Sequence, residues 1–117
     1  MAAALALHAG RTLARNWNVA GLVERLRRRA TCHLHGGRPD RELRWGRDVR
    51  RGDPIAVRYP GWRQFGHIGV LAEDGDGDGV LGPGDRVLHA GPDPLHESRL
   101  GDGGFDGEVV ILVPSLP

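Results

Sequence analysis

The sequence predicts an α+β domain in which N-terminal helices pack on a small, mainly antiparallel sheet. Three observations favour this fold class: an Ala- and Leu-rich start, an apolar stripe at helical spacing over residues 19–26, and four short apolar runs after residue 53. Helices early in a chain and strands late are typical of α+β domains. The 117 residues, of which 39% are apolar and 26% charged, suffice for one domain with one core.

The helical part is predicted to span residues 1–32. Residues 2–15 favour a first helix because Ala and Leu have high helix propensity. Asn18 is a good N-cap for a second helix. Four apolar residues then follow at i, i+3, i+4 and i+7, namely Val19, Leu22, Val23 and Leu26. We expect this stripe to pack on the sheet.

A connecting segment is predicted for residues 33–53, because charges, Gly and Pro interrupt any sustained period there. The sheet is expected within residues 54–117. Its strands are the apolar runs 55–59, 67–72, 86–90 and 108–113, each bounded by Gly, Pro or Asp. Nineteen glycines and eight prolines predict short elements joined by many turns.

The segment DGDGDGVLGPGD at residues 74–85 has the spacing of a calcium-binding loop. Calcium takes six to eight oxygen ligands, which alternate residues of a tight loop can supply. The segment resembles an EF-hand loop over its whole length. The resemblance implies these ligands: Asp74, Asp76, Asp78, the backbone carbonyl of Val80, and Asp85. Gly79 occupies the position of the sharp turn.

Two features of this segment depart from the EF-hand pattern. Asp85 replaces the usual Glu and is one methylene shorter, so it can bind through one oxygen or favour a smaller ion. The flanking residues are predicted strands and not helices. A flexible Asp-Gly turn without metal is the alternative interpretation.

Three further motifs resemble the sheet of NlpC-type and CHAP-type peptidoglycan hydrolases, in the papain-like cysteine peptidase group. They are GDPIAV at 52–57, GHIGVL at 66–71 and VLHA at 87–90, and the likeness extends over roughly residues 17–113. The resemblance implies that His67 is the general base and that His89 orients it. It also implies a papain-like fold.

The nucleophile of that family is a Cys at the start of a helix, and the matching position in NVAGLV at 18–23 is Val19. Valine offers no nucleophile. Cys32, the only cysteine, is a candidate for a relocated nucleophile, although a continuous helix would place it about 20 Å from residue 19. The cluster TCHLH at 31–35 is also compatible with a Cys-His metal site. A buried, unreactive packing residue is the simplest interpretation of Cys32.

Charge and composition bound the possible partners. Twelve Arg face four acidic residues in 1–51, whereas four Arg face eleven acidic residues in 52–117. An Arg-rich half can contact an anionic partner, but no nucleic-acid motif or stacking platform accompanies it, so nucleic acid is not favoured. Trp17, Trp45 and Trp62 can line a glycan or peptide groove or fill the core. No stretch is long enough to span a membrane.

Together these patterns predict a calcium-binding, NlpC/CHAP-like module that has lost its catalytic thiol. Its expected role is recognition of cell-wall peptide, or a structural place in a larger assembly such as a phage tail. The alternative is an active cysteine amidase or endopeptidase that cleaves peptidoglycan peptides with Cys32, His67 and His89. No signal peptide is recognisable, and the likeness favours an extracellular or virion-associated location.

Overall fold

The computed structural model describes residues 19–89 and 96–114, so the helix predicted for residues 2–15 lies outside the described residues. The described chain contains one short α-helix, α2 (Val19–Arg25), and a 3₁₀ turn, η1 (Leu100–Asp102). Its strands are β1 (Arg28–His35), β2 (Arg38–Pro39), β3 (Pro54–Arg58), β4 (His67–Glu73), β5 (Arg86–His89), β6 (Glu97–Arg99) and β7 (Gly107–Leu112). No helix among these residues is long and apolar enough to span a membrane.

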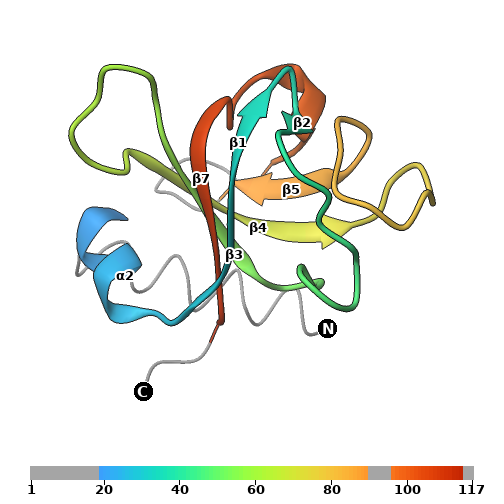
Figure 1. Cartoon of the computed structure of the whole chain (residues 1–117), viewed down its shortest axis with the longest axis horizontal. Coiled ribbons are helices and arrows are strands. Elements are labelled where there is room, and N and C mark those ends of the chain that lie inside the picture. Colours follow the sequence, from blue (N-terminus) through green and yellow to red (C-terminus); the bar gives the residue numbers. More distant parts are fainter. Residues whose placement is uncertain (1–18, 90–95, 115–117) are drawn as a thin grey trace.

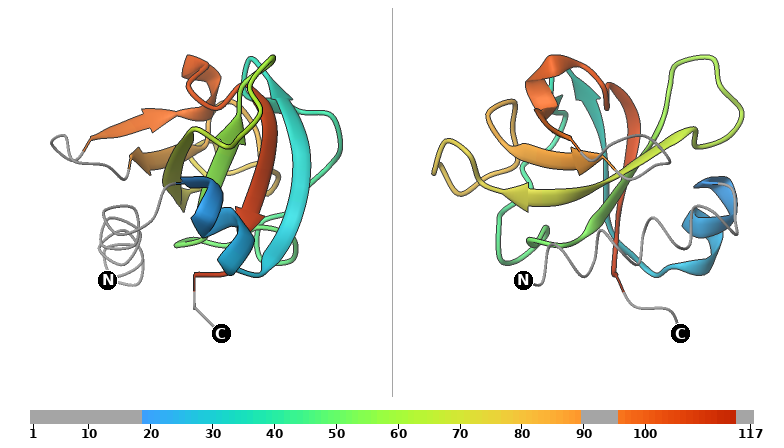
Figure 2. Two further views of the ribbon diagram at one scale, coloured as in Figure 1. Left: turned by 90° about the vertical axis from the view of Figure 1, so that its left-hand side faces the viewer. Right: turned by 180° about the vertical axis from the view of Figure 1, so that it is seen from behind.

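The seven strands form one curled antiparallel sheet in the order β2-β1-β7-β3-β4-β5-β6 (Figures 1 and 2). This arrangement corrects the predicted fold class. The protein is mostly β, not an α+β domain of helices packed on a sheet, and it does not support the papain-like architecture.

The error arose at β1, which covers residues assigned to the end of the helical part and the start of the connecting segment. Cys32 and Leu34 point into the core, whereas Thr31, His33 and His35 are exposed, which is the period of a strand. β1 pairs with β7, more than seventy residues later, from Arg28↔Leu112 to Leu34↔Gly107. A partner so distant in sequence leaves no local signal.

The sheet buries both of its faces. On the helix face, α2 lies against the sheet (Figure 2, left). Leu22, Val23 and Leu26 pack there with Val110 and neighbouring residues. The predicted apolar stripe is therefore confirmed, and Val19 packs at its margin.

The opposite face, called here the loop face, is covered mainly by segments without regular secondary structure. Leu43 and Val49 come from the predicted connecting segment, Leu81 from the acidic loop, and Phe105 from the turn before β7. All four side chains are at most 2% exposed. The acidic loop and the connecting segment thus belong to one core, which fixes their relative position.

Candidate functional site

The acidic loop connects β4 and β5 and projects from one side of the sheet (Figure 1, right). Short hydrogen bonds from backbone N–H groups to Asp side chains shape it. The N–H of Gly79 donates to Asp74 Oδ2 over 2.7 Å, and the N–H of Val80 donates to Asp78 Oδ1 over 3.1 Å. Gly77 and Gly79 have φ of 70° and 81°, a conformation that glycine adopts without strain.

Four carboxylates converge in this loop: those of Asp74, Asp76, Asp78 and Asp85 each offer an oxygen within 4.8 Å of the others. The cluster can hold a metal ion. Asp74 Oδ1 is buried and lacks a hydrogen-bond partner in the described part of the chain. An unpaired buried oxygen is costly, and a cation would satisfy it. Val80 lies in the same loop, and its carbonyl ligand stays a prediction.

Asp85 anchors the cluster to the core. It is fully buried, and its Oδ2 accepts hydrogen bonds from Trp45 Nε1 and the Gly82 N–H, both over 2.9 Å. Burial and the neighbouring Asp74 raise the pKa of Asp85 to about 7. Trp45 was not predicted to contact the loop, because it lies forty residues away and no local pattern links the two.

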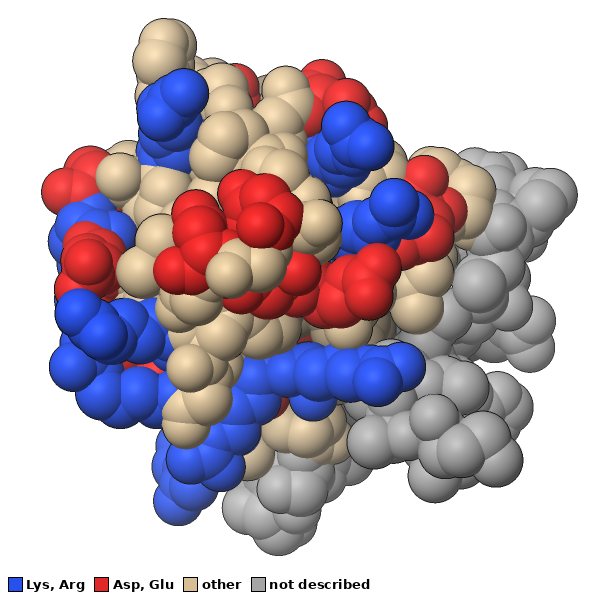
Figure 3. Space-filling model, turned by 90° about the vertical axis from the view of Figure 1, so that its right-hand side faces the viewer, with Lys and Arg blue, Asp and Glu red and all other residues tan. Residues whose placement is uncertain are grey.

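Backbone hydrogen bonds hold the second half of the loop to neighbouring segments. Leu81 N–H donates to Leu43 O over 2.8 Å, and Leu100 N–H donates to Asp85 O over 3.0 Å. Figure 3 shows acidic side chains gathered at the centre of this side of the molecule, with basic side chains around them. Neighbouring segments therefore form the scaffold of the loop. The carboxylates of Asp76 and Asp78 are exposed at the surface, where an ion can enter.

A second cluster lies on the loop face of the sheet, where β4 and β5 bring His67 and His89 together. His67 Nε2 lies 2.7 Å from His89 Nδ1, and His89 Nε2 lies 2.6 Å from Ser98 Oγ. Both imidazoles pack against Phe105, with ring centroids 5.1 and 5.5 Å away. When the Ser98 hydroxyl donates to His89 Nε2, the Nδ1–H of His89 can donate to His67 Nε2. Ser98 was missed because it has no sequence motif.

The two histidines are held in their neutral forms. Burial, with smaller contributions from His67 and His96, lowers the pKa of His89 to about 4. The ring of His96 stacks on that of His89 at 4.3 Å. Burial also lowers the pKa of His67. Neutral imidazoles can accept protons, so the pair is able to act as a base or as a structural hydrogen-bond chain.

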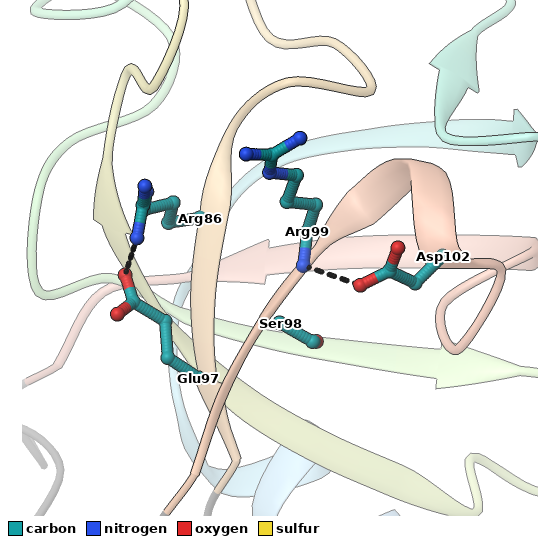
Figure 4. A pocket seen from close by; sticks show the side chains of 5 residues that line it. All are labelled: Arg86, Glu97, Ser98, Arg99 and Asp102. Atoms are coloured by element: carbon teal, nitrogen blue, oxygen red, sulfur yellow. Dashed lines mark hydrogen bonds and ion pairs between the residues drawn. The ribbon is translucent and has the colours of Figure 1, made fainter.

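Ser98 also lines a cavity of about 260 Å³ beside the edge strand β6 (Figure 4). Arg86 forms ion pairs there with Glu97 at 3.5 Å and with Glu73 at 3.3 Å. The Arg99 N–H donates to Asp102 Oδ2 over 2.9 Å. The histidine chain therefore ends at the edge of the sheet next to charged side chains.

The structure does not bring Cys32 to the histidines. Cys32 is 4% exposed, and burial and Asp40 raise the pKa of its thiol to about 11. In the sheet register, Cys32 lies opposite Val109 of β7, which lies opposite Val57 of β3, and Val57 lies opposite His67. Two strands, β7 and β3, therefore separate Cys32 from His67. Three strand spacings amount to about 14 Å.

Val19, the expected nucleophile position, is also separated from the histidines. It packs on the helix face, whereas His67 contacts Phe105 in the loop-face core. The arrangement of nucleophile and base that the NlpC/CHAP resemblance implies is therefore not reproduced.

Comparison of the chain with protein-family models, with curated proteins and with solved structures finds no match. The likeness to NlpC-type and CHAP-type hydrolases consequently rests on the three sequence motifs alone.

Proposed function

We propose that residues 74–85 bind Ca²⁺ and that the protein is a calcium-dependent binding module. The observation that carries this proposal is the convergence of four carboxylates within 4.8 Å, one of which has a buried oxygen without a partner. Carboxylates repel one another when no cation lies between them. A divalent cation would neutralise the cluster and hold the β4–β5 connection.

The ligand chemistry favours calcium over other divalent ions. The cluster contains only oxygen donors and neither His nor Cys, which argues against zinc and copper. Magnesium requires near-ideal octahedral geometry and usually keeps several waters, whereas calcium accepts irregular sets of many oxygens. The EF-hand spacing of the loop supports the same choice.

Thermal melting in Ca²⁺, Mg²⁺ and EDTA tests the proposal. A ligand at a hundred times its Kd adds about 2.7 kcal/mol to the free energy of unfolding, so calcium should raise Tm clearly. The double variant Asp76→Asn/Asp78→Asn removes two exposed charges and keeps acceptor oxygens for the loop hydrogen bonds. It should lose the calcium effect, whereas Glu24→Gln on α2 should retain it. Identical melts in calcium and EDTA would refute the proposal.

We also infer that the module acts by binding and not by thiol catalysis. The chain has a single cysteine, and two strands separate it from His67. The role that best fits the sequence motifs is recognition of cell-wall material. Co-sedimentation with purified peptidoglycan in calcium and in EDTA tests this role, and protein that stays in the supernatant under both conditions would exclude it.

A further inference from the structure

An exposed tryptophan marks a second surface, at the opposite end of β4 from the acidic loop. Trp62 is 55% exposed and is the only large hydrophobic side chain so exposed in residues 19–89 and 96–114. It lies in the loop between β3 and β4, which projects at the upper left of Figure 1. Exposing such a ring costs free energy unless a ligand covers it.

The ring of Trp62 is held in place despite its exposure. It lies directly over Gly66, where an added Cβ would come within 2.5 Å of Trp62 Cζ3. Tyr59 meets it edge-on, with ring centroids 5.2 Å apart and an interplanar angle of 74°. The Tyr59 hydroxyl in turn donates to Gly104 O over 2.9 Å. The tryptophan is therefore a fixed platform and loses little entropy when a ligand stacks on it.

A row of polar side chains lies beside this platform. The sheet register places His33 of β1 opposite Glu108 of β7, and Glu108 opposite Arg58 of β3. Residues directly opposite each other share one face of a sheet, so the three form a row across adjacent strands. Arg58 and Glu108 are joined by an ion pair.

The platform and the polar row border one cavity of about 280 Å³, lined by both aromatic residues and by all three members of the row. Sites for drug-sized ligands measure roughly 300–1,000 Å³, so this cavity suits a single small ring. None of its lining residues belongs to the acidic loop.

We propose that this cavity binds a pyranose ring of a saccharide, with one face of the sugar on Trp62 and its hydroxyl groups on His33, Glu108 and Arg58. A sugar ring has apolar C–H faces that suit an aromatic surface, and its hydroxyls need both donors and acceptors. Glu108 accepts, Arg58 donates, and His33 can do either.

The charges of the site argue against two other ligand classes. Arg58 is neutralised by Glu108, so the cavity has no free cation to attract the phosphates of a nucleic acid. An apolar peptide would cover the polar row without offering it any hydrogen-bonding groups. The site deepens the recognition role proposed above, but its geometry does not depend on that role or on calcium.

Titration with chitotetraose and cellotetraose, followed by the tryptophan indole N–H signals in ¹⁵N NMR spectra, tests the proposal. One bound ring implies a Kd in the millimolar range. The Trp62 signal should shift with saturation, in calcium and in EDTA alike, whereas the Trp45 signal should stay in place.

Variants on the exposed loop separate binding from folding. Trp62→Ala should weaken binding about tenfold or more, and Trp62→Phe should restore part of it because it keeps an aromatic face. Both variants lack the Trp62 indole signal, so their binding is followed by the backbone amide signals of Gly61 and Gly107, which also line the cavity. Unchanged spectra of the unmodified protein at saturating saccharide would overturn the proposal, as would undiminished affinity in Trp62→Ala. A response to a proline-rich peptide but to neither sugar would also overturn it. These outcomes can be interpreted even if the protein does not bind calcium, because the two sites share no residue.

Discussion

Gly69 of β4 is the residue whose small size allows the histidine cluster to form. It lies opposite His89 in the sheet, and a Cβ on it would come within 2.7 Å of Leu88 O, 2.9 Å of Val87 Cγ2 and 3.0 Å of Phe105 Cζ. Backbone and core atoms cannot move aside cheaply. The absent side chain leaves room for Phe105 to pack on both imidazoles.

Gly69→Ala should therefore lower the free energy of unfolding by about 1–3 kcal/mol. Gly82→Ala is a matched control because a Cβ there meets nothing within 4 Å. Urea denaturation of the two variants makes the comparison. Equal stability of both variants would show that the packing around Gly69 has room for a methyl group.

The neutral His89 predicts a pH dependence of stability. Its pKa is about 4 in the folded protein, below the ordinary value of 6.5. Between these values the unfolded chain binds the proton more readily, so stability should be complete above pH 6.5 and should fall as pH drops towards 4. Screening of the half-buried ring reduces the effect to roughly 1 kcal/mol.

The test is the difference in unfolding free energy between pH 7 and pH 5, compared with His89→Gln. The variant should lose part of the dependence, and the exposed His35→Gln should keep all of it. Identical pH profiles for His89→Gln and the unmodified protein would contradict the lowered pKa. His67 and His96 lie against the ring of His89, so the difference belongs to the histidine cluster and not to His89 alone.

Local spacing predicted some site residues and missed others. The aspartates of residues 74–85 share one short segment, whereas His67 opens one predicted strand and His89 lies within the next, so the sequence alone indicated both groups. Trp45 and Ser98 complete these groups through contacts that depend on the fold. Their partners lie far away in sequence or have no recognisable motif, and no local pattern indicated them.

At the scale of elements, the β1–β2 hairpin depends on one side chain from another part of the chain. Gly36 and Gly37 form its turn with φ of 59° and 77°, as a two-residue hairpin requires. Asp106 accepts hydrogen bonds from both glycine N–H groups, over 2.9 and 3.0 Å. The turn is thereby fastened to the segment just before β7.

Asp106→Ala should destabilise the protein by about 1–2 kcal/mol, because two N–H groups lose a charged acceptor. Asp106→Asn keeps one acceptor oxygen and should cost less. Glu42→Ala, which removes one partner of an exposed ion pair, should cost at most about 0.5 kcal/mol. Hydrogen exchange of the Gly36 and Gly37 amides measures the stability of the turn itself. Unchanged protection of these amides in Asp106→Ala would contradict the role of Asp106.

The same hairpin explains why the fold class was wrong. Arginine has good helix propensity, so the arginine-rich residues 25–29 favoured a helix where β1 begins. The alternation of polar and apolar residues over 31–35 was too short to outweigh this helix propensity. The pairing with β7 that stabilises β1 is entirely non-local. Where the signal was a local pattern, as in the apolar stripe of residues 19–26, the prediction was confirmed.

At the scale of the whole molecule, Cys32 reports on the integrity of the sheet. The thiol is 4% exposed and has a pKa of about 11. Reaction with a disulfide reagent such as DTNB at pH 8 should therefore be at least about 100-fold slower than for an unfolded thiol, and should accelerate in urea together with unfolding. Fast modification of the folded protein would contradict the burial of the Cys32 thiol and would make Cys32 a candidate nucleophile again.

Terbium luminescence reports whether a divalent cation binds among the four aspartates beside Trp45. Trp45 Nε1 donates to Asp85 Oδ2 over 2.9 Å, so an ion in the cluster lies close enough to receive excitation energy from the indole. We expect terbium emission on tryptophan excitation, and calcium should displace it. Trp45→Phe and Asp76→Asn/Asp78→Asn should abolish the emission, whereas Trp62→Phe should leave it intact. Absence of sensitised emission, or emission that calcium cannot displace, would contradict cation binding among the aspartates.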